Sequence, residues 1–308
     1  MNTKLTRRHF LKTGVIAGAG LSFPNLWIQS AHAAYAPGTS IHPNIDDLLV
    51  AGITDPAMVN GHKSVTNWAQ QESMVNREAV WENMNKMACG LSGKQSATSA
   101  WRTIFVIPPE KTAADTIVAI KTNGIARQHT RSAVMSKVCN VVVNDLGIPA
   151  RNIHIYDACH GGKLEQATPW KGLPEECRVE NKWGGSNTET AIPSPWSGKT
   201  AKCVEHLVND SVDILINISM CKGHGNQFGK FTMTMKNHFG TFTPRPGHGK
   251  QPLEYLVGIN RTPEILGPVN RKTGEITSPR QQLCIVDALW ASRGGPGGNP
   301  SDQPNFLA

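Results

Sequence analysis

Closely spaced cysteine pairs are missing from this sequence. Its seven cysteines are spread along the chain, and no two of them form a Cys-x-x-Cys pair. Ferredoxin-type clusters and zinc ribbons use such pairs to bring two ligands to one metal, so the spacing argues against both kinds of site. The odd number also leaves at least one cysteine outside any disulfide. The cysteines are Cys89, Cys139, Cys159, Cys177, Cys203, Cys221 and Cys284.

Long apolar runs and the common nucleotide-binding motifs are missing too. No stretch approaches the ~20 apolar residues that a membrane-spanning helix needs. Gly223, Gly225 and Gly229 read G-x-G-x-x-x-G, whereas the dinucleotide fingerprint is G-x-G-x-x-G. A phosphate loop needs four residues before Gly-Lys-Ser/Thr, but the segment after Gly225 offers too few, and Phe231 follows Lys230. Neither nucleotide motif is therefore present.

Strong charge of one sign is also lacking once the start of the chain is set aside. The formal net charge is +8, and four of the basic residues lie near the N-terminus at Lys4, Arg7, Arg8 and Lys12. Without these four residues the net charge is about +4. This modest excess does not indicate a nucleic-acid partner.

The first residues resemble a twin-arginine export signal. The motif is Thr6-Arg-Arg-His-Phe-Leu-Lys12, followed by a weakly apolar run over 13–23 and a small-residue cleavage site at Ala31-His-Ala33. A second site of the same kind, at Ala34-Tyr-Ala36, shifts the predicted cut by about three residues. We therefore predict that residues 1–33 are a signal peptide that uses the twin-arginine translocase. The mature protein is expected to be periplasmic, without a stable membrane span.

The rest of the chain is long enough for one sizeable α/β domain. Residues 34–100 are predicted to be a helical and irregular segment, with one or two amphipathic helices over 67–87. The order of strand, helix and strand over 116–157 favours parallel pairing. We therefore predict, for residues 101–308, an open, mostly parallel sheet with helices on both faces. The expected strands are 103–107, 116–121, 151–157, 213–219 and 282–287, and the expected helices are 131–146, 201–209 and 227–238.

The central feature of the sequence is a strand that enters a glycine-rich turn. Residues 213–219 alternate β-branched and small side chains, and Gly223 and Gly225 end the run. Such a turn lies at the carboxyl edge of an open sheet, where ligands bind, and a helix start there offers N–H groups to anions. Lys222, His224 and Lys230 add side-chain donors. The alternative is a tight turn with solvated lysines.

Other predicted strands also end in polar residues that would meet at the same edge. These residues are Lys121, Asn123, Asp157 and Asp287. A buried carboxylate beside lysine and histidine is typical of an acid/base pair or of a metal ligand. Carboxylates at strand ends also cap loops and helices, and the sequence leaves both interpretations open.

A metal site is a further hypothesis. His224, His238 and His248 could join Asp157 or Cys159 as ligands. The histidines do not share the tight spacing of a known zinc motif, so the sequence does not identify the metal. The sequence leaves the cofactor unknown.

Residues 159–199 are predicted to be a long insertion rich in glycine, proline and tryptophan. Trp170-Lys-Gly, Trp183-Gly-Gly and Trp196-Ser-Gly recur at regular intervals within it. One interpretation is an aromatic lid or a stacking surface for a sugar. The other is a loop that packs its own tryptophans as a small satellite core.

Several blocks resemble the proteins grouped as domain of unknown function 362. They are Val118-Ala-Ile-Lys-Thr-Asn123, Asn152-Ile-His-Ile-Tyr-Asp157, Asp213-Ile-Leu-Ile-Asn-Ile with Lys222-Gly-His224, Met235-Lys-Asn-His-Phe-Gly240 and Ile285-Val-Asp-Ala288. The resemblance covers residues 100–308. It implies that the signature positions are Lys121, Asn123, Asp157, Lys222, His224, Lys236, Asn237 and Asp287, without settling their roles.

The resemblance also carries expectations that this chain does not meet. The family is often described as iron–sulfur associated, and some relatives carry ferredoxin-like cysteine clusters, which are absent here. The family usually continues past the position of Ala308 with another helix and strand. The resemblance therefore predicts that this copy is shortened or that the sequence is a fragment.

Together these features predict a periplasmic α/β protein that binds a small anionic or metal-linked ligand at the carboxyl edge of its sheet. Lys222, His224 and Asp157 are the predicted catalytic residues if it is an enzyme, with redox or proton-transfer chemistry. The predicted ligand-binding residues are Lys121, Asn123, Lys236, Asn237 and Asp287. The alternative is a non-catalytic accessory or solute-binding protein for an exported redox partner.

Overall fold

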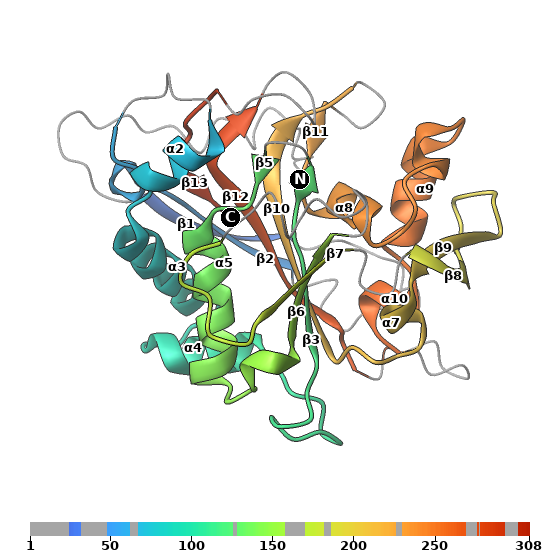
Figure 1. The fold of residues 1–308 in the computed structure, drawn as a ribbon, viewed down its shortest axis with the longest axis horizontal. Coiled ribbons are helices and arrows are strands. Elements are labelled where there is room, and N and C mark those ends of the chain that lie inside the picture. Colours follow the sequence, from blue (N-terminus) through green and yellow to red (C-terminus); the bar gives the residue numbers. More distant parts are fainter. Residues whose placement is uncertain are drawn as a thin grey trace, which may run out of the picture.

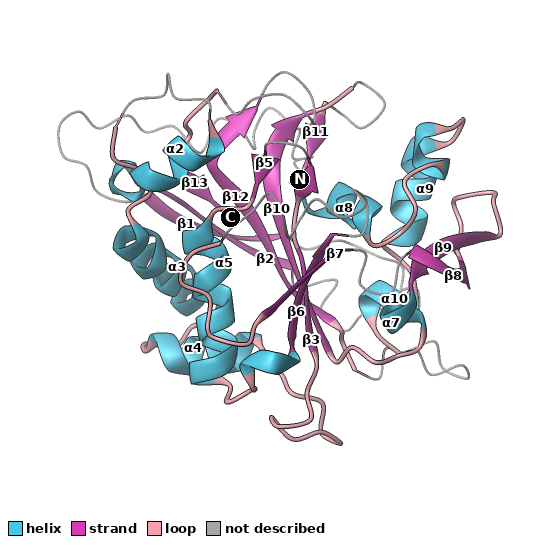
Figure 2. Ribbon diagram, viewed as in Figure 1, coloured by secondary structure: helices cyan, strands magenta, loops and turns pink. Residues whose placement is uncertain are grey.

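The computed structural model describes most of the chain after residue 24. The described ranges are 25–31, 48–61, 67–125, 128–157, 170–181, 186–225, 230–268, 276, 278–292 and 301–308. Within them, the strands form one nine-stranded sheet and two small two-stranded ones. Helices lie on both sides of the large sheet (Figures 1 and 2). The predicted α/β class is therefore confirmed.

Five neighbouring strands of the large sheet run parallel. In spatial order they are β12 (Gln281–Ser292), β10 (Ile214–Gly223), β3 (Val118–Lys121), β6 (Ile153–Asp157) and β7 (Arg178–Asn181). Antiparallel strands complete it: β13 (Phe306–Leu307), β2 (Leu48–Thr54) and β1 (Asn25–Ala31) continue from β12, and β11 (Phe231–Thr232) pairs with the end of β10. The sheet is mostly parallel, as predicted.

The central strands are buried on both faces, and alternate residues supply two separate cores. In β3, Ile120 belongs to one core and Ala119 to the other. In β10, Ile216 and Leu215 divide in the same way. Because successive strand side chains point to opposite faces, an uninterrupted apolar run serves both sides of the sheet. Lys121 and Asn217, which are register partners, therefore lie on the same face as Ala119 and Leu215.

The first face is covered by helices from the first half of the chain. They are α2 (Trp68–Met74), α3 (Arg77–Ser92), α4 (Ala97–Ile104) and α5 (Ser132–Asn140), which continues into a π-helical turn at Val141–Asp145. Side chains cap several of these helices: Asn76 accepts a hydrogen bond from Ala79 N at the start of α3, and Ser96 accepts one from Ser99 N at the start of α4. Gly93 ends α3 in the left-handed conformation.

The second face carries shorter helices and a hairpin. The helices are α7 (Glu205–Val208), α8 (Thr234–Asn237), α9 (Pro252–Ile259) and α10 (Pro263–Leu266), and the hairpin pairs β8 (Ser186–Ala191) with β9 (Thr200–Val204). A second hairpin pairs β4 (Gly124–Ile125) with β5 (Gln128–His129). Short 3-10 turns lie at Pro56–Met58, Ala150–Asn152, His238–Gly240 and Pro246–His248.

Three predicted elements were wrong. No strand forms at 103–107: residues 103–104 end α4 and residues 105–107 follow it outside any helix or strand, because the Ser96 cap starts a helix whose Trp101 packs into the core. The helix expected over 227–238 is replaced by β11 and the single turn α8, with 226–229 outside the described residues. The helix expected over 201–209 is half wrong, because residues 201–204 belong to β9 and only Glu205–Val208 form the short helix α7.

The segment before residue 101 contributes more than the sequence indicated. The expectation of one or two helices over 67–87 is confirmed by α2 and α3, but β2 was not predicted and is part of the main sheet. β1 falls inside the predicted signal peptide, the rest of which lies outside the described residues. No helix within the described ranges combines the length and apolar character that a membrane crossing requires.

Candidate functional site

The order of the parallel strands creates a switch point between β3 and β10. From β3 the chain adds β6 and then β7 on one side, and it later returns to place β10 and β12 on the other side. In open α/β sheets, ligands bind at the carboxyl ends of the strands beside such a reversal. β3 ends at Lys121, next to Asn217, while β10 continues to Gly223. Lys121, Asn123 and Lys222 therefore lie at this switch point.

Lys121 is held in a buried polar cluster. Its Nζ donates to the carbonyl of Thr122 at 2.5 Å and lies 3.4 Å from Oδ1 of Asp157. The side chains of Lys121 and Asp157 are 1% and 4% exposed, so this ion pair is shielded from water. Oδ2 of Asp157 also accepts a hydrogen bond from Gly124 N at 2.8 Å. A buried pair of this kind needs such additional hydrogen bonds, because desolvation of both charges is costly.

Lys222 reaches the same cluster from β10. Its Nζ donates to Oδ1 of Asn123 at 2.5 Å, and Nδ2 of Asn123 donates to Oδ1 of Asn237 at 3.3 Å. Oδ1 of Asn237 lies 3.4 Å from Nζ of Lys121 as well. Asn237 thus connects the ends of β3 and β10, because Lys121 and Lys222 both contact it directly or through Asn123.

Asn237 is itself fixed by the sheet. Its Nδ2 lies within hydrogen-bond distance of Oδ1 of Asn217 (2.8 Å) and of the carbonyl oxygen of Ile218 (3.1 Å). It comes from the one-turn helix α8, whose position is further tied to β10 by a hydrogen bond from Asn217 Nδ2 to the carbonyl of Thr234 at 2.9 Å. The short helix therefore serves to place one amide between two strand ends.

Gly240 allows the chain after α8 to pass directly over the cluster. A Cβ atom at this position would overlap Oδ1 of Asp157 and would lie 2.8 Å from Cε of Lys121. Any larger residue would displace the ion pair. The glycine in the Lys-Asn-x-x-Gly block is thus explained by close approach.

His238 lies in the protein interior and not at the surface of the site. It is fully buried, with Nε2 2.6 Å from Oε1 of Gln281 and Nδ1 3.1 Å from Oγ1 of Thr241. Burial lowers the pKa of His238 to about 3, and the charge of Lys121 lowers it further while the hydrogen bond to Gln281 opposes the shift. His238 is therefore neutral near pH 7 and engaged at both ring nitrogens.

His224 and Lys236 lie nearer the surface of the same region. Burial lowers the pKa of His224 to about 4, and the nearby charges of Lys236, His248 and Lys222 act in the same direction. Nζ of Lys236 lies 4.5 Å above the ring of Phe239, which in turn contacts the ring of His248 edge-on at 5.6 Å between ring centres. The field at His224 is thus positive.

Asp287 lies apart from the residues around Lys121 and Lys222. Its Oδ2 accepts a hydrogen bond from Arg131 N at 2.7 Å and its Oδ1 accepts one from Leu289 N at 3.2 Å. Burial raises the pKa of Asp287, whereas Arg131 lowers it. These contacts favour the capping interpretation. The buried guanidinium of Arg131, which stacks on Trp68 and Trp290, was not identified from the sequence.

Among the described residues, the predicted metal ligands are not gathered into one site. Within the described part of the chain, no group of three histidine, cysteine or acidic side chains is placed to hold a metal ion. His238 is occupied as above, and Nδ1 of His248 lies 2.8 Å from the carbonyl of Pro244. Cys159 lies outside the described residues. The described geometry therefore adds no support to the metal hypothesis.

Two of the three repeated tryptophans pack into the protein. Trp170 is 9% exposed and its Nε1 donates to the carbonyl of Thr130 at 2.8 Å. Trp196 contacts Tyr255 edge-on, with ring centres 4.8 Å apart. Trp183 lies outside the described residues. Trp170 belongs to the core on the first face of the sheet, and Trp196 packs against the core on the second face, so these two tryptophans form neither an open stacking surface nor a satellite core of their own.

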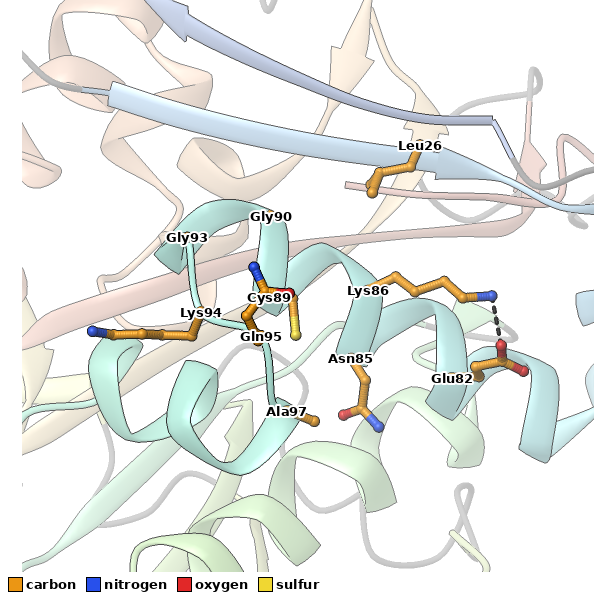
Figure 3. Close-up of a pocket in the computed structure, with 10 residues that line it drawn as sticks. All are labelled: Leu26, Glu82, Asn85, Lys86, Cys89, Gly90, Gly93, Lys94, Gln95 and Ala97. Atoms are coloured by element: carbon orange, nitrogen blue, oxygen red, sulfur yellow. Dashed lines mark ion pairs between the residues drawn. The ribbon is translucent and has the colours of Figure 1, made fainter.

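A surface pocket lies elsewhere, between β1 and helices α3 and α4 (Figure 3). Leu26 approaches it from β1, and Cys89 and Gly90 line it from α3. Its charged residues include Lys86, which forms an ion pair with Glu82 at 2.6 Å within the same helix. The residues at the switch point form what we call the lysine cluster: Lys121, Asn123, Asp157, Lys222 and Asn237. The pocket contains none of them, so it is not part of the switch-point site.

Comparison with known proteins places most of the chain in one family. The model of a family described as a domain of unknown function (DUF362) matches residues 118–308. The matched region starts at β3 and includes every residue of the lysine cluster. No curated protein matches the chain.

Proposed function

The chain belongs to the domain of unknown function (DUF362) family, and from that premise and the geometry of the switch point we propose that it binds a small anionic ligand there. The observation that carries the proposal is the convergence of Lys121, Lys222 and Lys236 at the carboxyl edge of the sheet. All three are buried, at 1%, 1% and 7% exposure. Three ammonium groups gathered at one edge of a sheet create a positive potential that attracts a negatively charged ligand.

The charges around the cluster support an anion more than a cation. Asp157 is the carboxylate that the described contacts place beside Lys121. The groups that act on His224 are positive, and they lower its pKa. A bound anion would relieve this repulsion and raise the pKa of His224. Carboxylate and phosphate groups are the common biological anions that lysine ammonium groups recognise as point charges.

The proposed roles follow from position. Lys222, His224 and Lys236 would contact the anion, because the charges of both lysines act on His224. Asn123 and Asn237 would orient it, since both amides are held by fixed partners. Asp157 would act on a proton of the ligand, with Lys121 as its counter-ion. If the protein is an enzyme, this set suits proton transfer or the protonation steps of a redox reaction.

The test is thermal stabilisation by small anions. Inorganic phosphate, sulfate, acetate and citrate should be titrated against wild type and a Lys222→Gln variant, because a ligand that binds the folded state raises the melting temperature. We expect at least one anion to stabilise wild type and its apparent affinity to fall at least tenfold in Lys222→Gln. Lys236→Gln provides a second variant if the first does not fold.

Lys86→Gln is the matched control. Lys86 has a side chain that is 40% exposed, and it pairs with Glu82 away from the cluster. Its replacement should leave anion stabilisation unchanged. The proposal is wrong if no anion stabilises wild type, or if the Lys222 and Lys86 variants respond alike.

A periplasmic location is the second part of the proposal and rests on the twin-arginine motif of the sequence. The protein should appear in the periplasmic fraction of a host with the twin-arginine pathway. Replacing Arg7 and Arg8 together with lysine should retain it in the cytoplasm. Equal export of both forms would contradict this proposal.

The rival function is a non-catalytic accessory or solute-binding protein for an exported redox system. Once a ligand is identified, Lys222→Ala separates the two functions. An enzyme should lose turnover of that ligand while it keeps its fold, whereas a binding protein should lose affinity and show no turnover in either form.

A further inference from the structure

Two cysteines from distant parts of the sequence meet beside the sheet. Cys139 lies near the end of α5 and is fully buried, and Cys177 lies just before the edge strand β7 and is half-buried. Both pack in the same apolar core. Each thiol shifts the pKa of the other, and both are free cysteines, so the shared core holds two interacting thiols without a disulfide.

The segment that carries Cys177 is fixed along α5 by further hydrogen bonds. Nε1 of Trp170 donates to the carbonyl of Thr130 at 2.8 Å, and Lys171 N donates to Oγ of Ser132 at 3.0 Å. Nδ2 of Asn140, the neighbour of Cys139, donates to the carbonyl of Gly172 at 3.2 Å. The proximity of the two thiols therefore belongs to an ordered interface between the helix and this segment.

The two thiols differ in the way that a thiol–disulfide exchange requires. The hydrogen bond from Cys139 lowers the pKa of Cys177, whereas the same hydrogen bond and burial raise the pKa of Cys139. Cys177 is also the more accessible of the two. The thiolate is the attacking species in such exchanges, so Cys177 is suited to react first and Cys139 to react second.

We propose that Cys139 and Cys177 form a reversible disulfide that links α5 to the edge of the sheet. In the first step the Cys177 thiolate attacks an external disulfide, forms a mixed disulfide and releases one external thiolate. In the second step Cys139, after losing its proton to solvent, attacks Sγ of Cys177 and releases the other external thiolate. The protein pair is oxidised by two electrons, and the external disulfide is reduced to two thiols.

The bond would close a loop of the chain that contains β6 and Asp157. It would stabilise the folded protein, because cross-linking restricts the unfolded chain. The proposal does not depend on the anion site or on export, because it rests on the contact between α5 and the segment before β7.

The experiment uses the full chain. Protein that is reduced with dithiothreitol, and the same protein incubated with oxidised glutathione, are alkylated under denaturing conditions, digested and analysed by mass spectrometry. We expect a cross-linked peptide pair containing Cys139 and Cys177 after oxidation, and a higher melting temperature than in the reduced protein. Cys89→Ser, which changes a different half-buried cysteine, should give the same result.

Two further variants test the order of the steps. Cys177→Ser should show neither the cross-link nor the rise in melting temperature. Cys139→Ser should accumulate glutathione on Cys177, because the second thiol is missing. If Cys139→Ser does not fold, wild type and Cys177→Ser still decide the question. Absence of the cross-linked pair from oxidised wild type, or a cross-link from Cys177 to another cysteine, would overturn the proposal.

Discussion

Lowering the pH from 7 to 5 should destabilise the protein through His238. Because burial lowers the pKa of His238 to about 3, the folded protein keeps this imidazole neutral at pH 5, with Gln281 and Thr241 as its partners. In the unfolded chain the same group has its ordinary pKa of 6.5. The unfolded state therefore binds a proton that the folded state does not, and stability falls with pH.

The sign and the size of the change in stability follow from the difference between the folded and unfolded pKa values of His238. The contribution of neutral His238 is fully present above pH 6.5 and is lost progressively as the pH falls towards 3. Each pH unit costs about 1.4 kcal/mol where the unfolded group is fully protonated and the folded group is not. Since the unfolded group is only partly protonated near pH 6.5, the loss between pH 7 and pH 5 should be about 2 kcal/mol.

Urea denaturation at pH 7, 6 and 5 measures this effect when wild type is compared with His238→Gln. The variant should be less stable than wild type at pH 7, because it loses the ring contacts. Its further loss between pH 7 and pH 5 should be about 2 kcal/mol smaller, since glutamine does not titrate. Other titrating groups are common to both proteins and cancel. Equal losses in the two proteins would refute the buried, neutral state of His238.

Two more predictions concern the ion pair of the cluster. Gly240→Ala should lower the free energy of unfolding by roughly 1–3 kcal/mol, because the new methyl group overlaps Asp157. Urea denaturation measures this loss. A variant as stable as wild type would contradict the close approach of Gly240 to Asp157. Asp157→Asn should be destabilising by about 3 kcal/mol, since Lys121 loses its buried counter-ion. The same variant should nevertheless bind inorganic phosphate more tightly by calorimetry, and weaker binding would argue against a positively charged site.

The central part of the fold could be predicted from the sequence. Strands β3, β6, β10 and β12 were expected near their observed positions, because buried parallel strands read as continuous apolar runs ended by glycine or polar residues. The helix at 131–146 was also confirmed as α5 and its π-helical turn. In these segments, local pattern and tertiary burial favour the same structure.

The failures occur where tertiary contacts override local propensity. Residues 234–237 form only one helical turn, because Asn237 must reach Lys121 and Asn217, and the chain must then pass over Asp157 at Gly240. Segment 200–204 is a strand because β8 pairs with it, and no short-range pattern specifies this partner. Residues 48–54 are mostly apolar, but their local pattern does not specify that β13 would pair with them.

The candidate site, like the fold, could be predicted from the sequence only in part. Strand ends could be recognised along the sequence, so Lys121, Asn123 and Lys222 were correctly expected to lie together at one edge. The sequence did not distinguish His238, which is a buried structural group, from His224, because burial depends on the elements that surround each side chain. Asp287 was expected in the cluster but is hydrogen-bonded to the backbone of Arg131 and Leu289.

The position of β13 has a consequence for the order in which the protein is assembled during synthesis. β13 lies between β12 and β2, so the described N-terminal strands join the main sheet through Phe306 and Leu307. β13 follows the other described strands in the chain, so β2 can pair with it only after the segments between them have been synthesised. This pairing of distant segments favours slow completion of the sheet.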